Sequence, residues 1–353
     1  MTVGETIRAY YSLCRVSISL FAALSAAVGL RLTAHPLWTA IPVLTAGVFL
    51  TACGACALNQ YQERGADALM ARTAGRAIPS GRIRPRDGLC FSLILIGSGL
   101  WMLSRTGHPA PILGLGAVLW YNGFYTWLKS RTAFAPFPGA LAGVVPPAIG
   151  WLVGGGSPVD PALAFLCFFF LTWQMPHFLL HRMAFRDEYA VAISRPSLTA
   201  VFDDEQIRRL VFQWLIATGV GLQMVIVRGP ALSTAVRIGL LGISLWLLVT
   251  AISFLSAGRP LPRSVFRKIS YVALAVMLLL IADKIPHDID SAMVPGRTGT
   301  GMPITGTATV IPASNPKPKP ARPERGSAAR LLEGFTEAIS SPGERSGSPH
   351  TSL

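Results

Sequence analysis

The stretch IPVLTAGVFLTACGACALNQYQERGAD, residues 41–67, decides the class of fold. Most of it belongs to an apolar run that begins near residue 37 and predicts a helix over 37–57, about the 20 residues that cross a bilayer. The run leads without a break into Asn59, Glu63 and Asp67. An apolar helix that ends in such side chains predicts a membrane protein whose chemistry lies near one membrane face.

The composition of the whole chain agrees with this prediction. Of its 353 residues 51% are hydrophobic and only 14% are charged, and the mean hydropathy is +0.49. A soluble domain needs more charge to cover its surface. The start of the chain is polar and has no signal-peptide cleavage pattern, so we expect the first apolar helix to be retained.

Further apolar stretches, each bounded by Gly, Pro or charged residues, predict further spans. The expected fold is all-α, a polytopic membrane domain over 1–285 followed by a Pro/Ser/Gly-rich disordered tail over 286–353. Nine transmembrane helices are expected, at roughly 14–32, 37–57, 88–104, 109–128, 137–154, 161–180, 210–227, 233–255 and 268–285.

The basic residues alternate between the two sides of these spans. Alternate connections hold seventeen Lys and Arg residues, and the opposite ones hold four. The positive-inside rule then places the N-terminus and the basic loops in the cytoplasm and the tail outside. We expect the protein itself to lie in the inner membrane. The net charge of +14 comes from basic residues in the loops and the tail, and these residues do not alternate with aromatic ones. We therefore expect membrane lipid with anionic head groups as the partner, and not nucleic acid.

Cys53 and Cys56 form a CxxC pattern, which often indicates redox or metal chemistry. Here the pair lies inside an apolar helix, without a second pair or a nearby histidine. Packing is favoured over thiol or haem chemistry.

The residues that follow the second span predict a site for a diphosphate. Asn59, Glu63 and Asp67 are spaced by four and therefore share one face of a helix. Such oxygen ligands suit Mg²⁺, although a solvated helix end with Glu63 paired to an arginine has the same pattern. The next residues add Arg72 and Arg76, whose planar guanidinium groups bind phosphate oxygens in pairs.

These motifs give the chain a specific resemblance, from about residue 8 to residue 285. It resembles the UbiA superfamily of intramembrane prenyltransferases, and within it most closely the branch of protohaem IX farnesyltransferases (haem O synthases). The first acidic signature is Asn59-x3-Glu63-x3-Asp67 with the arginine-rich run after it. The other matches, in order along the chain, are Tyr125-Thr126-Trp127-Leu128-Lys129-Ser130-Arg131-Thr132, Gly139-Ala140, Pro146-Pro147-Ala148-Ile149-Gly150-Trp151, Trp173-Gln174-Met175-Pro176-His177-Phe178 and Arg186-Asp187-Glu188-Tyr189.

The resemblance implies a helical bundle with a central cavity open to the membrane, capped by two acidic loops. It implies Mg²⁺-dependent transfer of the farnesyl group of farnesyl diphosphate to a vinyl group of haem B, which gives haem O. The implied catalytic residues and metal ligands are Asn59, Glu63, Asp67 and Asp187, with Glu188 assisting. The implied substrate-binding residues are Arg72, Tyr125, Lys129, Arg131, His177 and Arg186.

His177 allows two functional interpretations and a structural one. It could position haem by ligating the iron or by contacting a propionate, because a histidine inside a membrane helix is a functional candidate. It could instead be bonded to a neighbouring carbonyl group.

The chain also departs from the family pattern. Glu63 and Gly65 stand where the family usually has Asp, Cys14-Arg15 replaces a Lys-Pro pair, and the run 192–198 is altered. These departures mark a divergent member and keep two alternatives open. One is a prenyltransferase that acts on an aromatic quinone precursor or a chlorin. The other is a membrane transporter or haem-handling protein without catalysis.

Overall fold

The computed structural model describes residues 2–33, 37–184, 198–228, 232–256 and 263–283. Throughout these ranges the regular elements are helices, which confirms the all-α class. The long helices are α1 (Val3–Cys14), α2 (Val16–Arg31), α3 (Ile41–Gln62), α6 (Pro85–Ser104), α7 (Pro109–Val118), α10 (Val145–Val153), α11 (Pro161–Ala184), α14 (Asp204–Arg228), α15 (Thr234–Ser256) and α16 (Arg263–Ala282). The short elements are η1 (Trp38–Ala40), α4 (Arg64–Ala68), α5 (Ala71–Ala74), η2 (Leu119–Tyr125), α8 (Thr126–Leu128), α9 (Pro136–Ala140), η3 (Leu141–Gly143) and α13 (Leu198–Val201).

The starts of the helices follow from the sequence. A capping box opens α1, where Thr2 accepts a hydrogen bond from the backbone N–H of Glu5 and the Glu5 carboxylate accepts one from Thr2. Before α14, Asp203 and Gln206 exchange the same pair of bonds, at 2.7 and 3.0 Å. Several other helices begin at a proline, which is suited to the first helical turn because that turn leaves its N–H groups unbonded.

Six helices within the described ranges are long and apolar enough to cross a membrane. The bent pair α1 and α2, with an angle of 47° between them, raises the number to seven if it forms one span. The expected count of nine is therefore not confirmed. One reason is the predicted span 109–128, which divides into α7, the π-helical η2 and α8, so no single regular helix covers it.

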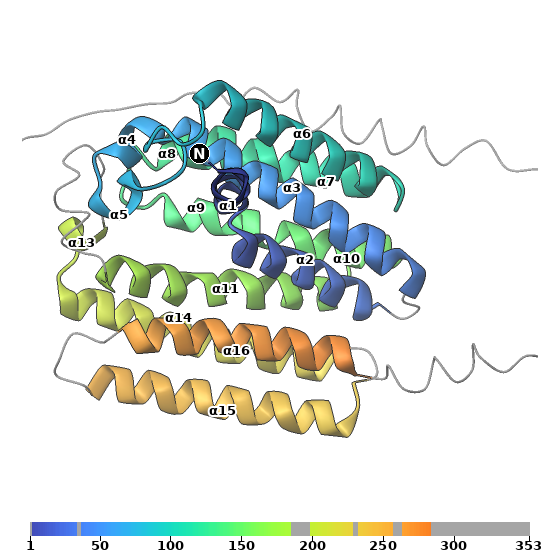
Figure 1. The fold of residues 1–353 in the computed structure, drawn as a ribbon. Helices are drawn as coiled ribbons and strands as arrows, with labels where there is room; N and C mark the ends of the chain where they lie inside the picture. Colours follow the sequence, from blue (N-terminus) through green and yellow to red (C-terminus); the bar gives the residue numbers. More distant parts are fainter. Residues whose placement is uncertain (1, 34–36, 185–197, 229–231, 257–262, 284–353) are drawn as a thin grey trace, which may run out of the picture. The chain divides into compact units, whose positions relative to one another are not determined.

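Two groups of helices share the core. The helices α11, α14, α15 and α16 pack against one another, as Figure 1 shows. The helices α2, α3, α6, α7 and α10 form the second group, and α2 and α10 also contribute side chains to the core of the first. Cys53 and Cys56 are buried in α3, as expected of packing residues.

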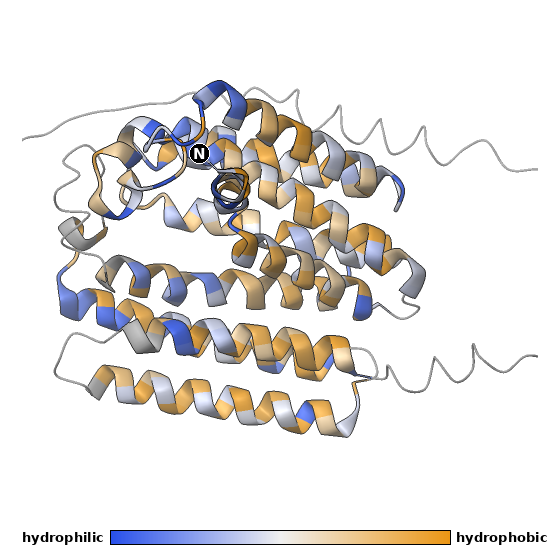
Figure 2. Cartoon of the chain, viewed as in Figure 1, coloured by the Kyte–Doolittle hydropathy of each residue, from blue (hydrophilic) through white to orange (hydrophobic). Residues whose placement is uncertain are grey.

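The outer surface is that of a membrane protein. Large apolar side chains stay exposed along α6 and α15, among them Ile94, Trp101, Leu245 and Ile252. A soluble protein rarely exposes so much apolar surface. Hydrophilic residues gather around α4, α5 and the beginnings of α6 and α14 (Figure 2), the end of the bundle where α3 and α11 also end (Figure 1). The chain is therefore an integral membrane protein whose polar residues concentrate at one end of its helices.

Two glycines let α2 and α10 approach closely. A Cβ atom on Gly150 would lie 1.8 Å from the carbonyl oxygen of Ala26, and one on Gly29 would lie 1.9 Å from that of Pro147. Only a residue without a side chain allows the backbones to come this close. This contact ties α2 to α10 within the second group, and side chains of both helices also reach the core of the first.

We expect Gly150→Ala to destabilise the protein by about 1–3 kcal/mol or more, because the added methyl group forces α2 and α10 apart. Thermal unfolding in detergent measures the effect. The matched control is Gly116→Ala in α7, where nothing lies within 4 Å of the new atom. Equal unfolding temperatures for the two variants would contradict the close approach.

Candidate active site

Asn59, Glu63 and Asp67 lie on one helical face, as their spacing predicts. The backbone N–H of Glu63 donates to the carbonyl of Asn59 at 2.9 Å, and that of Asp67 donates to the carbonyl of Glu63 at 2.8 Å. The helical hydrogen-bond register therefore runs on from α3 into α4, although Glu63 itself marks the boundary between them. This continuity aligns the three side chains.

All three side chains are buried. Their exposed fractions are 3% for Asn59, 7% for Glu63 and 2% for Asp67. The alternative of a solvated helix end is therefore wrong. Ionised carboxylates withdrawn from water need a charged partner or a metal ion, because the cost of desolvation is several kcal/mol per charge.

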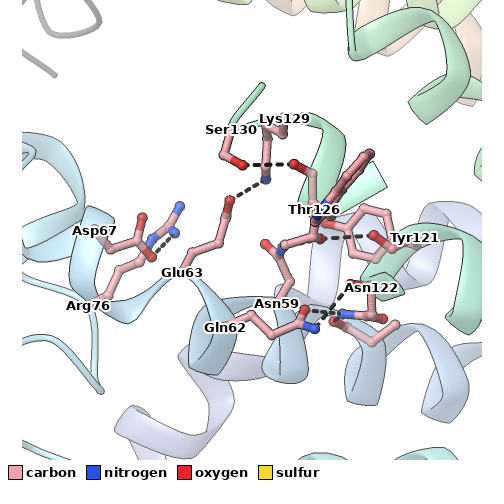
Figure 3. A network of polar contacts seen from close by, with 12 residues as sticks. Asn59, Gln62, Glu63, Asp67, Arg76, Tyr121, Asn122, Thr126, Lys129 and Ser130 are labelled. Atoms are coloured by element: carbon pink, nitrogen blue, oxygen red, sulfur yellow. Dashed lines mark hydrogen bonds and ion pairs between the residues drawn. The ribbon is translucent and has the colours of Figure 1, made fainter. Parts of the chain in front are cut away.

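Each carboxylate has a cationic partner. Lys129 Nζ lies 2.7 Å from Glu63 Oε1, and Arg76 Nη1 lies 2.6 Å from Asp67 Oδ2. Figure 3 shows the two pairs side by side, with Glu63 pointing toward Lys129 beyond α8 and Asp67 toward Arg76 beyond α5. Lys129 is thus a partner of Glu63. The pairing neutralises both acids within the protein.

A polar network fixes α3 against η2 and α8. Asn59 donates to the hydroxyl of Thr126 at 2.9 Å, and Thr126 in turn donates to the carbonyl of Tyr121 at 2.9 Å. Asn122 donates to the carbonyl of Ala55 at 3.0 Å and to the side chain of Gln62 (Figure 3). The π-helical turn of η2 leaves backbone carbonyls without regular α-helical partners, and such turns recur at functional sites.

The predicted substrate-binding residues fall into different places. Tyr125 is buried, and Lys129 Nζ lies 5.1 Å from the centre of its ring. Arg72 is half-buried in α5, on the same loop as Arg76. Arg131 is exposed, with its guanidinium 4.1 Å from the ring of Trp127, so it lies apart from the two ion pairs. The structure thus brings Lys129 and Tyr125 to the acids but not Arg131.

Two residues of the cluster were not among the implied catalytic, metal-binding or substrate-binding residues. Arg76 is the partner of Asp67, and Thr126 is the partner of Asn59. Both stand inside motifs quoted above, beside Arg72 and Tyr125. The sequence could have predicted the role of Arg76. An acid that is buried at a helix end needs a counter-ion, and two arginines follow it closely in the chain.

His177 lies on α11 and packs on α16. Its ring centre is 4.4 Å from that of Phe266 and 5.3 Å from that of Trp173. Its Nδ1 is 3.1 Å from the hydroxyl oxygen of Ser270. The structural interpretation predicted a bond to a carbonyl group, whereas Nδ1 contacts the hydroxyl of a serine.

The second acidic loop lies outside the described residues. Asp187, Arg186 and Glu188 lie outside the described residues, as do the altered run 192–197 and the predicted tail 286–353. Within the described part of the chain, no three His, Cys, Asp or Glu side chains gather as ligands of one metal ion. The oxygen donors of Asn59, Glu63 and Asp67 nevertheless have the hard, acidic chemistry that Mg²⁺ prefers.

Comparison with known proteins gives a consistent result. Residues 19–281 match the model of the UbiA prenyltransferase family. A protein named protoheme IX farnesyltransferase from Oleidesulfovibrio alaskensis is 34% identical over 286 residues, covering 79% of this chain and 97% of the relative. Another of that name, from Nitratidesulfovibrio vulgaris, is 42% identical over 179 residues, but the match spans only 62% of its length and 50% of this chain.

Solved structures share the fold. Digeranylgeranylglyceryl phosphate synthase has a TM-score of 0.63 at 15% identity, covering 80% of this chain and 99% of that one. A UbiA homolog from Archaeoglobus fulgidus, solved with GPP and Mg²⁺, has a TM-score of 0.59 at 14% identity, covering 77% and 98%. Identities this low establish a common fold and no more.

We expect Arg76→Leu to destabilise the ligand-free protein by about 3–5 kcal/mol, because it leaves the buried carboxylate of Asp67 without its counter-ion. Adding Asp67→Asn to this variant should restore much of the loss. Thermal unfolding compares the two with Arg82→Leu, a control that removes an exposed arginine of the same loop. If Arg76→Leu unfolded at the same temperature as Arg82→Leu, the ion pair would not hold the loop.

Proposed function

This chain belongs to the UbiA prenyltransferase family, and on that premise we propose that it transfers the farnesyl group of farnesyl diphosphate to a vinyl group of haem B. The product is haem O. Relatives named protoheme IX farnesyltransferase support this choice of donor and acceptor. The observation that carries the proposal is the buried row Asn59, Glu63 and Asp67 with its two cations.

The ion pairs suit a site that receives a diphosphate. Lys129 and Arg76 each lie within ion-pair distance of a buried carboxylate. A diphosphate offers both cations a second anionic partner, and they can turn toward it while the carboxylates take up new ligands. Arg72, on the loop of Arg76, adds a further guanidinium for phosphate oxygens. In this way each charged group changes its partner within the site and stays shielded from water.

A magnesium ion fits the donor set. Asn59, Glu63 and Asp67 would hold it, together with Asp187 of the second acidic loop. When bound, Mg²⁺ neutralises the diphosphate as negative charge builds up on it. Glu63 reaches one methylene further than the Asp usual in the family, and its carboxylate pairs with Lys129 in this chain.

The reaction begins when the bond between C1 of the farnesyl chain and the diphosphate oxygen breaks. The electron pair leaves with the diphosphate, whose charge Lys129 and Arg76 stabilise. The vinyl group of haem B attacks the allylic cation and forms the new C–C bond. Water then adds to the cation left beside the porphyrin and loses a proton to the solvent, which completes a hydroxyethylfarnesyl side chain.

The proposed reaction needs a site that excludes water. We place the diphosphate at the polar end of the bundle and the farnesyl chain in a central cavity between the apolar helices, since an allylic cation must be kept dry until it is captured. His177, on α11, lies on the acceptor side. We also propose that the N-terminus and this polar end face the cytoplasm, that the tail lies outside, and that the protein lies in the inner membrane, on the basis of the positive-inside rule.

A direct assay tests the proposal. Membranes that contain the full chain are incubated with labelled farnesyl diphosphate, Mg²⁺ and haem B, and the extracted pigments are separated and weighed by mass spectrometry. Labelled haem O supports the proposal. Label found only in an added aromatic quinone precursor or chlorin would replace the acceptor, and no labelled product with any acceptor would favour a transporter or haem-handling protein.

We expect Asp67→Asn to lower the rate of transfer by at least about a hundredfold, the size of effect seen when one group that stabilises a developing charge is removed. The variant keeps the shape of the side chain but loses its charge. Haem O formation measures the effect, and the unfolding temperature checks that the protein is folded. The matched control is Asp87→Asn, an exposed acid at the start of α6. A fully active Asp67→Asn variant would refute the assignment of this carboxylate.

A further inference from the structure

Ser270 forms a hydrogen-bonded link between α16 and His177. Its hydroxyl oxygen lies 3.0 Å from the backbone carbonyl oxygen of Phe266, one turn earlier in α16. The same oxygen lies 3.1 Å from Nδ1 of His177 on α11. The two contacts therefore meet at one atom.

The chemistry of these groups decides which atom carries each hydrogen. A serine hydroxyl has one hydrogen, and a carbonyl oxygen can only accept. Both contacts are hydrogen bonds only if Ser270 donates to Phe266 and accepts from Nδ1–H of His177. We propose that Ser270 is a positioning residue, which holds the hydrogen of neutral His177 on Nδ1 and leaves Nε2 as a bare acceptor.

Aromatic packing holds the ring in place for this bond. Phe266 and Trp173 contact the ring of His177 at centre distances of 4.4 and 5.3 Å. Trp173 is itself fixed, because its Nε1 donates to the carbonyl of Ile269 at 3.1 Å and Phe21 stacks on it at 4.6 Å. The ring therefore has little freedom to turn and exchange its two nitrogens.

An unprotonated Nε2 favours ligation of the haem iron over a hydrogen bond to a haem propionate. A neutral imidazole with its hydrogen on Nδ1 can ligate iron through Nε2, but it cannot donate a hydrogen bond to a propionate. Iron ligands of this kind commonly have their other ring nitrogen bonded to a protein acceptor, as here. The inference rests on the proposed function: His177 binds the iron of the haem substrate, and Ser270 sets the nitrogen that does so.

The first test needs no haem. We record the ¹⁵N NMR spectrum of histidine-labelled full-length protein in lipid nanodiscs and assign His177 by its absence in His177→Gln. In the wild type we expect a protonated Nδ1 and an unprotonated Nε2. We expect Ser270→Ala to lose this pattern and Ser270→Thr to keep it. A wild-type His177 with its hydrogen on Nε2 would overturn the inference, whatever the protein catalyses.

The second test adds ferrous haem B. Resonance Raman spectroscopy should show an iron–histidine stretching band that His177→Gln abolishes and Ser270→Ala shifts. In Ser270→Ala we expect the KM for haem B to rise about 10- to 100-fold, with kcat little changed and Ser270→Thr close to wild type. The control is Ser244→Ala on α15, which removes a hydroxyl bonded to a backbone carbonyl and no histidine.

The outcomes separate the two proposals. If the wild type makes haem O but its band and KM do not respond to Ser270→Ala, the role of Ser270 is wrong and the proposed function stands. If haem binds with the expected band but no haem O forms, the proposed function is wrong and the role of Ser270 stands. If the wild type shows no iron–histidine band, the ligation is refuted.

Discussion

The site depends on the cost of burying charge at the end of an apolar helix. Glu63 and Asp67 are almost fully withdrawn from water, so each must be matched by a cation or lose its ionisation. Lys129 comes from the end of α8 and Arg76 from the loop after α5. Electrostatic pairing therefore holds three separate stretches of chain together at one end of the bundle. Without these cations the carboxylates would carry the full cost of their desolvation.

Local periodicity is the part of this site that the sequence predicts well. A spacing of four places Asn59, Glu63 and Asp67 on one face wherever a helix forms, and the backbone bonds confirm it. Lys129 and Arg131 differ in their contacts for a related reason. Residues two apart in a helical turn point in different directions, so Lys129 turns to Glu63 while Arg131 lies on Trp127.

The long-range contacts could not be predicted in the same way. Nothing in the acidic motif indicates that Asn59 bonds to Thr126, because that pairing depends on how α3 packs on η2. Hydropathy likewise could not reveal the π-helical turn, since it changes the hydrogen-bond register and not the apolar composition. This turn is also why the span predicted over 109–128 is not one regular helix.

The acidic cluster and the histidine are held by different helices, and this separation bears on how the family varies. Lys129, Thr126 and the three polar residues of α3 and α4 form one bonded unit, whereas His177 is fixed by Trp173, Phe266 and Ser270 of α11 and α16. A change such as Glu63 in place of Asp therefore falls in the unit that contains Lys129 and not in the unit that contains His177. In the proposed function the acceptor lies at His177, so the departures in the first acidic motif concern the diphosphate side of the site.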